Sequence, residues 1–251
     1  MTLDAMQWHE AATLPFLDED YRRTGLARLA RRYVVGRRVL DLRCLTGSLA
    51  VALVAEGREV VALDGCRQAV EMTNALAKRQ GLTGGVARWW DLRMLAKWVD
   101  GRRFDTVLCL DVLNHVRDDE AAVADIARVL CPGGRLILAA PAFPSLLGKR
   151  DQSLGHLRRY TKPGLRRLLE RQGLKVGMMR FWNAVALPAY AVIERGLRSR
   201  LSDRLRYGWG GRLGSLQNRI LATWYTAVEN RLAFPFGLTL FAVSNKPQGN
   251  G

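Results

Sequence analysis

The segment Val39-Leu40-Asp41-Leu42-Arg43-Cys44-Leu45-Thr46-Gly47 decides the fold of this chain. It starts as a short apolar run that reads as a strand, and a helical pattern follows near residues 48–56. A strand that runs through a tight turn into a helix places glycines in the turn, because glycine accepts conformations that other residues resist. Gly47 keeps this character, whereas Arg43 and Leu45 stand where glycines belong.

Short β-rich runs alternate with helical patterns from Arg38 to Pro141. Such alternation is typical of βαβ units, whose right-handed crossovers build a parallel sheet with helices on both faces. A ligand then binds outside the carboxyl ends of the first, second and fourth strands, at the topological switch point. The pattern predicts strands at 39–42, 59–64, 86–90, 106–110 and 135–140, and helices near 48–56, 67–80, 93–99 and 119–130.

The second half of the chain continues the same architecture. Cys131-Pro132-Gly133-Gly134 ends the fourth helix and turns the chain into strand five, and Lys162-Pro163 opens a helix that runs to about Gln172. Strands six and seven are predicted at 175–181 and 238–244, with an insertion of two helices between them. The expected fold is therefore α/β: a Rossmann-like, seven-stranded, mostly parallel sheet with a helical insertion before the last strand.

This reading divides the chain into four parts. We expect an N-terminal helical segment (1–35), the core (36–183), the helical insertion that covers a substrate (184–232), and the final strand with its tail (233–251). The insertion combines an apolar stretch, 184–193, with an aromatic pair, Trp224 and Tyr225.

The chain is strongly basic, with 39 Lys and Arg against 23 Asp and Glu, a net charge of +16 and a pI near 10.6. This balance favours polyanions or an anionic membrane surface as partners, although an arginine-rich composition also follows from a GC-rich genome.

Four cysteines without metal-ligand spacing are read as buried thiols. Residues 1–10 show no signal sequence and no run reaches a membrane span, so we expect a cytoplasmic protein, with peripheral contact at the inner membrane face through 184–232 as an alternative.

Three blocks carry a family resemblance. The first is the opening segment. The second comprises Phe104-Asp105-Thr106-Val107, Leu113-Asn114-His115-Val116 and Leu130-Cys131-Pro132-Gly133-Gly134, and the third comprises Asp151 with Gly155-His156-Leu157-Arg158-Arg159-Tyr160. Together they resemble class I S-adenosylmethionine (SAM) methyltransferases of the type 11/12 group. Asn114 replaces the usual Glu, and the first glycine motif is degenerate.

The resemblance implies SAM as cofactor. Asp64, at the end of strand two, is placed to accept both ribose hydroxyls, with a helix N-cap as the alternative role. Asp91 would accept from the adenine amino group beside the apolar Leu92, or serve only as a loop residue. The full set of expected cofactor-binding residues is Asp41, Arg43, Leu45, Gly47, Asp64, Gly65, Asp91, Leu92 and Asp111.

Two histidines are the candidate catalytic residues. His115 and His156 both fall on loops at the carboxyl edge of the sheet, where an imidazole can take a proton from a substrate as methyl transfers. Each could instead be a hydrogen-bonded support for its loop. Arg158, Arg159 and Tyr160 could grip an anionic substrate, or form a solvated basic face.

The acidic run Asp118-Asp119-Glu120 suits the first turn of a helix better than a metal site, so no metal is expected. Asp111-Val112-Leu113-Asn114 does not match the motif of nucleic-acid amino methyltransferases, so a nucleic acid is not the expected substrate. The leading prediction is SAM-dependent methyl transfer to the oxygen, nitrogen or carbon of a small molecule. The alternative is a methyltransferase-like protein that has lost methyl transfer and acts as a cyclase, isomerase or partner subunit, because side chains at 43 and 45 crowd the turn.

Overall fold

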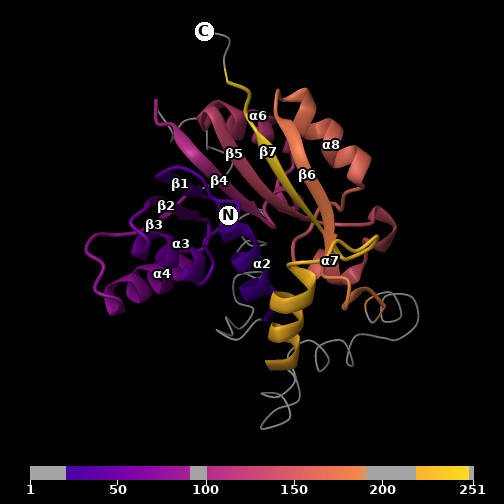
Figure 1. Cartoon of the computed structure of the whole chain (residues 1–251), viewed down its shortest axis with the longest axis horizontal. Helices are drawn as coiled ribbons and strands as arrows, with labels where there is room; N and C mark the ends of the chain where they lie inside the picture. Colours follow the sequence, from indigo (N-terminus) through magenta and orange to yellow (C-terminus); the bar gives the residue numbers. More distant parts are fainter. Residues whose placement is uncertain (1–20, 91–100, 189, 191–218, 249–251) are drawn as a thin grey trace.

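The computed structural model describes residues 21–90, 101–188, 190 and 219–248 (Figure 1). Its centre is a seven-stranded sheet in the order β3-β2-β1-β4-β5-β7-β6. The strands are β1 (Arg38–Asp41), β2 (Glu59–Asp64), β3 (Ala87–Trp89), β4 (Phe104–Leu110), β5 (Leu130–Pro141), β6 (Lys175–Trp182) and β7 (Thr239–Asn245). Strands β1 to β5 pair in parallel, and β7 runs antiparallel to both β5 and β6. The Rossmann-like α/β prediction is thus confirmed.

Helices cover both faces of this sheet. The longer ones are α2 (Tyr21–Arg31), α3 (Ser48–Ala55), α4 (Arg67–Arg79), α6 (Asp119–Val129), α8 (Lys162–Arg171) and a helix over 219–224 that continues as the π-helical turn η4 (Tyr225–Glu229). Figure 1 shows this last helix beside α2, at the end of the molecule opposite the C-terminus.

The buried side chains explain why the helices divide between the two faces. Neighbouring strand residues point to opposite faces, so Val39 packs with Leu29 of α2, whereas Leu40 packs in the cluster that holds Ile126 of α6 and Leu165 of α8. Because both faces are covered, the central strands are mostly apolar.

The observed strands lie close to the predicted ones, with one exception. β5 begins at Leu130, and its partner register with β4 jumps from Leu130 to Arg135. Cys131-Pro132-Gly133-Gly134 is therefore a bulge within β5 and not a turn before it. Gly133 has a φ of 75°, which explains the glycine there.

Three short helices were not predicted: η2 (Leu113–His115) after β4, and η3 (Pro144–Leu146) and α7 (Lys149–Ser153) after β5. The predicted helix at 93–99, and residues 189 and 191–193 of the predicted helix at 184–193, lie outside the described residues.

Candidate active site

The turn after β1 keeps a glycine-like backbone in spite of its side chains. Leu45 has a φ of 52° and Gly47 a φ of 77°, both in the left-handed region. At position 47 a Cβ atom would also lie 2.5 Å from the side chain of Thr73, so glycine is required there. Leu45 adopts the same region at a cost, because a Cβ is disfavoured in it.

Asp64 ties this turn to the start of α4. Its carboxylate is buried and accepts from the backbone N–H of Leu45 at 3.0 Å and of Cys66 at 2.9 Å. The N-cap of α4 is Cys66, so the alternative that Asp64 caps this helix is wrong. The thiol of Cys44 also lies 4.0 Å from Oδ2, so of the about four acceptor positions of a carboxylate, one on Oδ1 remains for a ligand. Burial raises the pKa of this carboxyl group, while the nearby Arg43 opposes the rise.

Arg43 crosses the crevice between the ends of β1 and β4. Its Nη1 donates to the carbonyl oxygen of Asp111 at 2.9 Å and lies 3.0 Å from Nε2 of His115. Asp111, with a φ of 55°, also accepts from Arg22 of α2 at 3.2 Å. Burial raises the pKa of Asp111, but Arg22 and Arg43 outweigh that effect and hold it below its usual value.

His115 is a neutral imidazole with both nitrogens engaged. Because Arg43 is a donor, Nε2 of His115 accepts from it, and the proton is assigned to Nδ1, which donates to the carbonyl oxygen of Gly155 at 3.1 Å. Burial, and then the charge of Arg43, lower the pKa of His115 to about 2. This ring therefore has no free lone pair with which to take a proton.

His156 has a different environment. Its Nδ1 lies 2.8 Å from Oδ1 of Asp151, and the backbone N–H of His156 donates to the Asp151 carbonyl oxygen, also at 2.8 Å. Within the described part of the chain, Nε2 of His156 makes no hydrogen bond. Asp151 is almost fully buried; burial raises its pKa, but the bonds from His156 and Arg159 lower it to about 2. An ionised carboxylate thus holds a proton on Nδ1 and leaves Nε2 as the acceptor.

Two further side chains fix Asp151. Nε of Arg159 donates to Oδ2 of Asp151 at 2.9 Å, and the hydroxyl of Tyr190 lies 3.1 Å from the same oxygen. Arg159 also donates to Tyr190 at 2.6 Å and to the carbonyl oxygen of Ala142 at 3.0 Å. The two alternatives for this arginine, an anion grip and a solvated face, are both wrong, because its guanidinium is buried and engaged.

The neighbouring residues of this loop also bind other groups of the protein. Tyr160 is buried and donates to Asp119 at 2.9 Å, and Arg158 pairs with the same carboxyl group at 2.8 Å. Asp118 accepts from the backbone N–H of Ala121 and so caps α6, as its position at a helix start suggests. Among the described residues no three His, Cys, Asp or Glu side chains gather as a metal site.

These groups form one continuous chain across the carboxyl edge of the sheet. The His115 and His156 rings meet edge to face, with their centroids 4.9 Å apart. Arg43 and Asp111 therefore adjoin the Asp151–His156 pair through His115.

The remaining predicted cofactor residues lie nearby or outside the described residues. Asp41 is buried just below the turn, and the carbonyl oxygen of Gly65 accepts from the indole N–H of Trp89. Asp91 and Leu92 lie outside the described residues.

Comparison with known proteins decides the family. Residues 40–138 match the family model described as a methyltransferase domain. Over 104 residues the chain is 31% identical to the ubiquinone biosynthesis O-methyltransferase of Coxiella burnetii. This stretch covers 41% of this chain and 43% of that protein, so the chain matches less than half of the relative's length. Residues 40–138 are a methyltransferase domain.

Solved structures extend the likeness in fold beyond this domain match. A putative sarcosine dimethylglycine methyltransferase from Galdieria sulphuraria has a TM-score of 0.59 and 18% identity, over 90% of this chain and 86% of that one. The [4+2]-cyclase SpnF has a TM-score of 0.55 and 19% identity, over 91% of this chain and 82% of that one. At these identities the two structures establish the fold alone.

Sequence reasoning missed several residues of this methyltransferase domain's edge. Arg22 gave no signal because the first 35 residues resemble the family poorly, and Tyr190 stands alone in an apolar stretch. Asp151 was part of the resemblance, and its position five residues before His156 could have suggested a pair.

No helix among the described residues is long and apolar enough to cross a membrane.

Proposed function

We propose that the protein transfers the methyl group of SAM to a hydroxyl oxygen of a small molecule. The observation that carries this proposal is the Asp151–His156 pair, a buried carboxylate that orients an imidazole with a free Nε2 at the carboxyl edge of the sheet. The O-methyltransferase relative supports oxygen as the acceptor atom over nitrogen or carbon.

In this proposal the turn and the strand ends hold the cofactor. The remaining acceptor position of Asp64 suits a ribose hydroxyl, and the weak thiol contact on its other oxygen can give way to a second hydroxyl. We assign Asp41, Arg43, Leu45, Gly47, Gly65 and Asp111 to the same cofactor site, and Asp91 and Leu92 to the adenine. When bound, SAM supplies an electrophilic methyl group on a positively charged sulfur.

His156 acts as the general base. Its Nε2 would take the proton of the acceptor hydroxyl, and the ionised Asp151 would stabilise the resulting imidazolium. The methyl group that the oxygen gains would leave the sulfur, which keeps the electron pair of that bond, so that S-adenosylhomocysteine is the second product. Arg159 and Tyr190 are positioning residues, because they bind Asp151 and do not reach the reacting atoms. His115 is assigned a supporting role in place of catalysis, since Arg43 occupies its Nε2.

Calorimetric titration with SAM and with S-adenosylhomocysteine, followed by transfer of labelled methyl to a panel of hydroxylated small molecules, tests this function. We expect micromolar binding of both cofactors, and turnover that His156→Ala reduces about 10²–10⁴-fold without weakening cofactor binding. Binding without transfer to any acceptor would favour the cyclase, isomerase or partner-subunit alternative. Absence of binding would remove the proposal altogether.

A further inference from the structure

A group of apolar and aromatic side chains faces solvent where the chain returns from the insertion to the sheet. Ile220 is 59% exposed and Leu232 is 57% exposed, which is unusual for large aliphatic residues so close together in sequence. We call this surface the apolar face; it consists of Val185, Ile220, Trp224, Leu232, Phe234 and Phe236.

Five members of the apolar face adjoin one another, and Leu232 lies two residues before Phe234 in the sequence. Ile220 and Trp224 are four residues apart on a helix and so lie on the same side of it. The ring centroids of Trp224 and Phe234 are 6.4 Å apart, and those of Phe234 and Phe236 are 6.5 Å apart. Val185 adjoins them, because its backbone N–H and the indole N–H of Trp224 both donate to Oε1 of Glu229 at 3.2 Å.

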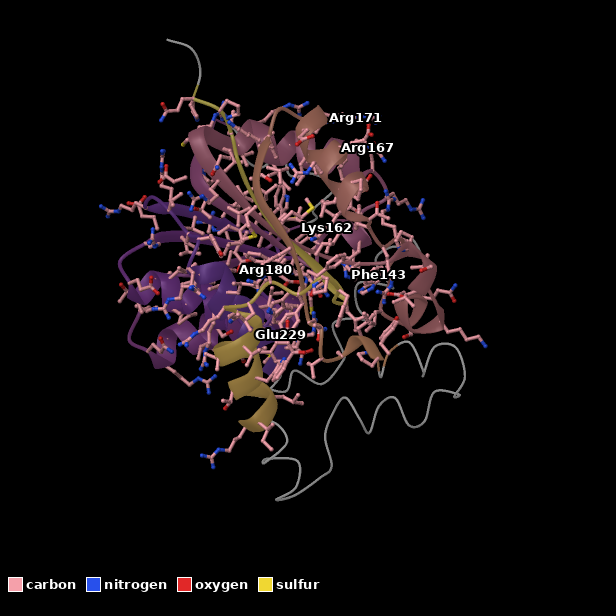
Figure 2. The ribbon with its side chains drawn as sticks, turned by 45° about the vertical axis from the view of Figure 1, so that its right-hand side comes forward. Phe143, Lys162, Arg167, Arg171, Arg180 and Glu229 are labelled. Carbon is pink, nitrogen blue, oxygen red and sulfur yellow. The ribbon has the colours of Figure 1, made fainter. Side chains whose placement is uncertain are left out.

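This surface is anchored firmly to the end of β6. The buried carboxylate of Glu229 accepts from the backbone N–H groups of Asn183 at 3.0 Å and Ala184 at 2.8 Å. Arg180 donates to the carbonyl oxygen of the same residue, and Figure 2 shows both labelled side chains where β6 meets this helix. The apolar face is therefore a built part of the fold, on the same edge of the sheet as His156.

Two arginines border the apolar face. Arg219 and Arg231 are exposed at either end of the helical stretch, and neither makes an ion pair within the described part of the chain. The chain as a whole carries a net charge of +16. A second copy of so basic a protein would be repelled from this surface, whereas an anionic surface would be attracted.

We propose that the apolar face docks on an anionic phospholipid bilayer. The aromatic and aliphatic side chains would enter the boundary between headgroups and acyl chains, where Trp and Phe are favoured, and the arginines at the rim would meet the lipid phosphates. In this orientation the carboxyl edge of the sheet lies close to the membrane.

Vesicle co-sedimentation with the full chain tests this proposal. The vesicles contain phosphatidylcholine alone, or phosphatidylcholine mixed with an equal amount of phosphatidylglycerol. We expect at least tenfold stronger binding to the mixed vesicles. The double variant Ile220→Ser/Leu232→Ser should weaken this binding more than tenfold, and Arg219→Gln/Arg231→Gln should weaken it about fivefold for each arginine removed.

Two matched controls lie on and near β3, at the opposite edge of the sheet. Trp89→Ser removes a side chain that is 47% exposed, and Lys78→Gln/Arg79→Gln in α4 removes the same charge as the arginine pair. Both should leave binding unchanged. Failure of the parent protein to sediment with mixed vesicles, or equal losses in the controls, would overturn the proposal. So would a dimer in sedimentation velocity that Ile220→Ser/Leu232→Ser dissociates, because a second copy would then cover the face.

Discussion

The guanidinium of Arg43 donates to Nε2 of His115 at 3.0 Å, between the carboxyl ends of β1 and β4, where we propose that the cofactor binds. Arg43, which replaces a glycine of the usual motif, therefore has a structural role. It joins the turn after β1 to the loop after β4, and together with burial, the larger cause, it keeps one of the two histidines at this edge neutral.

Removing this donor should restore the basicity of His115. In Arg43→Gln the pKa of His115 should rise from about 2 toward the ordinary 6.5, because the second-largest cause of its depression is gone while burial remains. NMR titration of the His115 imidazole signals measures this change. An unchanged pKa of His115 in the variant would contradict the role given to Arg43.

A second prediction concerns the strained leucine of the same turn. Leu45→Gly should make the protein about 1 kcal/mol more stable or leave its stability unchanged. Relief of a left-handed φ is worth roughly 1–3 kcal/mol, and the extra freedom of the unfolded glycine offsets about 0.4–1 kcal/mol of it. Urea unfolding gives the free energy. Gly47→Ala should instead lower stability, because the new Cβ would be strained by a φ of 77° and would clash with the Thr73 side chain. A Leu45→Gly variant that unfolds at as low a urea concentration as Gly47→Ala would contradict this account.

The Asp151–His156 pair makes a prediction about turnover. Asp151→Asn should lower kcat about 10²–10⁴-fold while the affinity for SAM stays unchanged, because the amide neither fixes the required tautomer nor stabilises the imidazolium. Tyr190→Phe, which removes one bond to Asp151, should have a smaller effect and should shift the pH profile of kcat. A fall in SAM affinity as large as the fall in kcat would show that Asp151 acts only on the fold.

Burial of Asp41 predicts an unusual dependence of stability on pH. Burial, and then the neighbouring charge of Asp64, raise the pKa of Asp41 from 3.8 to about 7, although the backbone N–H of Arg43 opposes the rise. The folded protein therefore holds a proton that the unfolded chain releases above about pH 4, so this group's contribution to stability declines as pH rises from 3.8 to about 7. Asp41→Asn should remove the decline and be the more stable protein at pH 8, as urea unfolding at several pH values would measure. A parallel pH dependence in the two proteins would contradict the raised pKa.

The sequence predicted the strands well because their apolar runs and the turns between them are local signals. Leu130 at the start of β5 escaped prediction, since a bulge depends on pairing with β4 and not on the bulged residues alone. The site was only half predictable. His156 and Asp64 are marked by their positions at strand ends and loops, whereas the partner of a side chain, such as Tyr190 for Asp151, comes from parts of the chain that only folding brings together.

Asp64 provides the test of the cofactor crevice itself. Truncation to Ala would leave the backbone N–H groups of Leu45 and Cys66 without their acceptor and so perturb the turn. A loss of affinity in Asp64→Ala could then come from the disturbed turn and not from the lost contact with ribose. In Asp64→Asn, the loss of charge-assisted bonds to ribose, each worth about 1.5–3 kcal/mol, should weaken both SAM and S-adenosylhomocysteine at least tenfold in calorimetry. Thr73→Val is the matched control, because the Thr73 hydroxyl donates to the carbonyl oxygen of Ala69 at 2.8 Å and lies 3.4 Å from the Leu45 carbonyl oxygen of the same turn. Equal losses of affinity in the two variants would mean that Asp64 serves the turn alone, whereas a loss confined to Asp64→Asn places the ribose on its carboxylate.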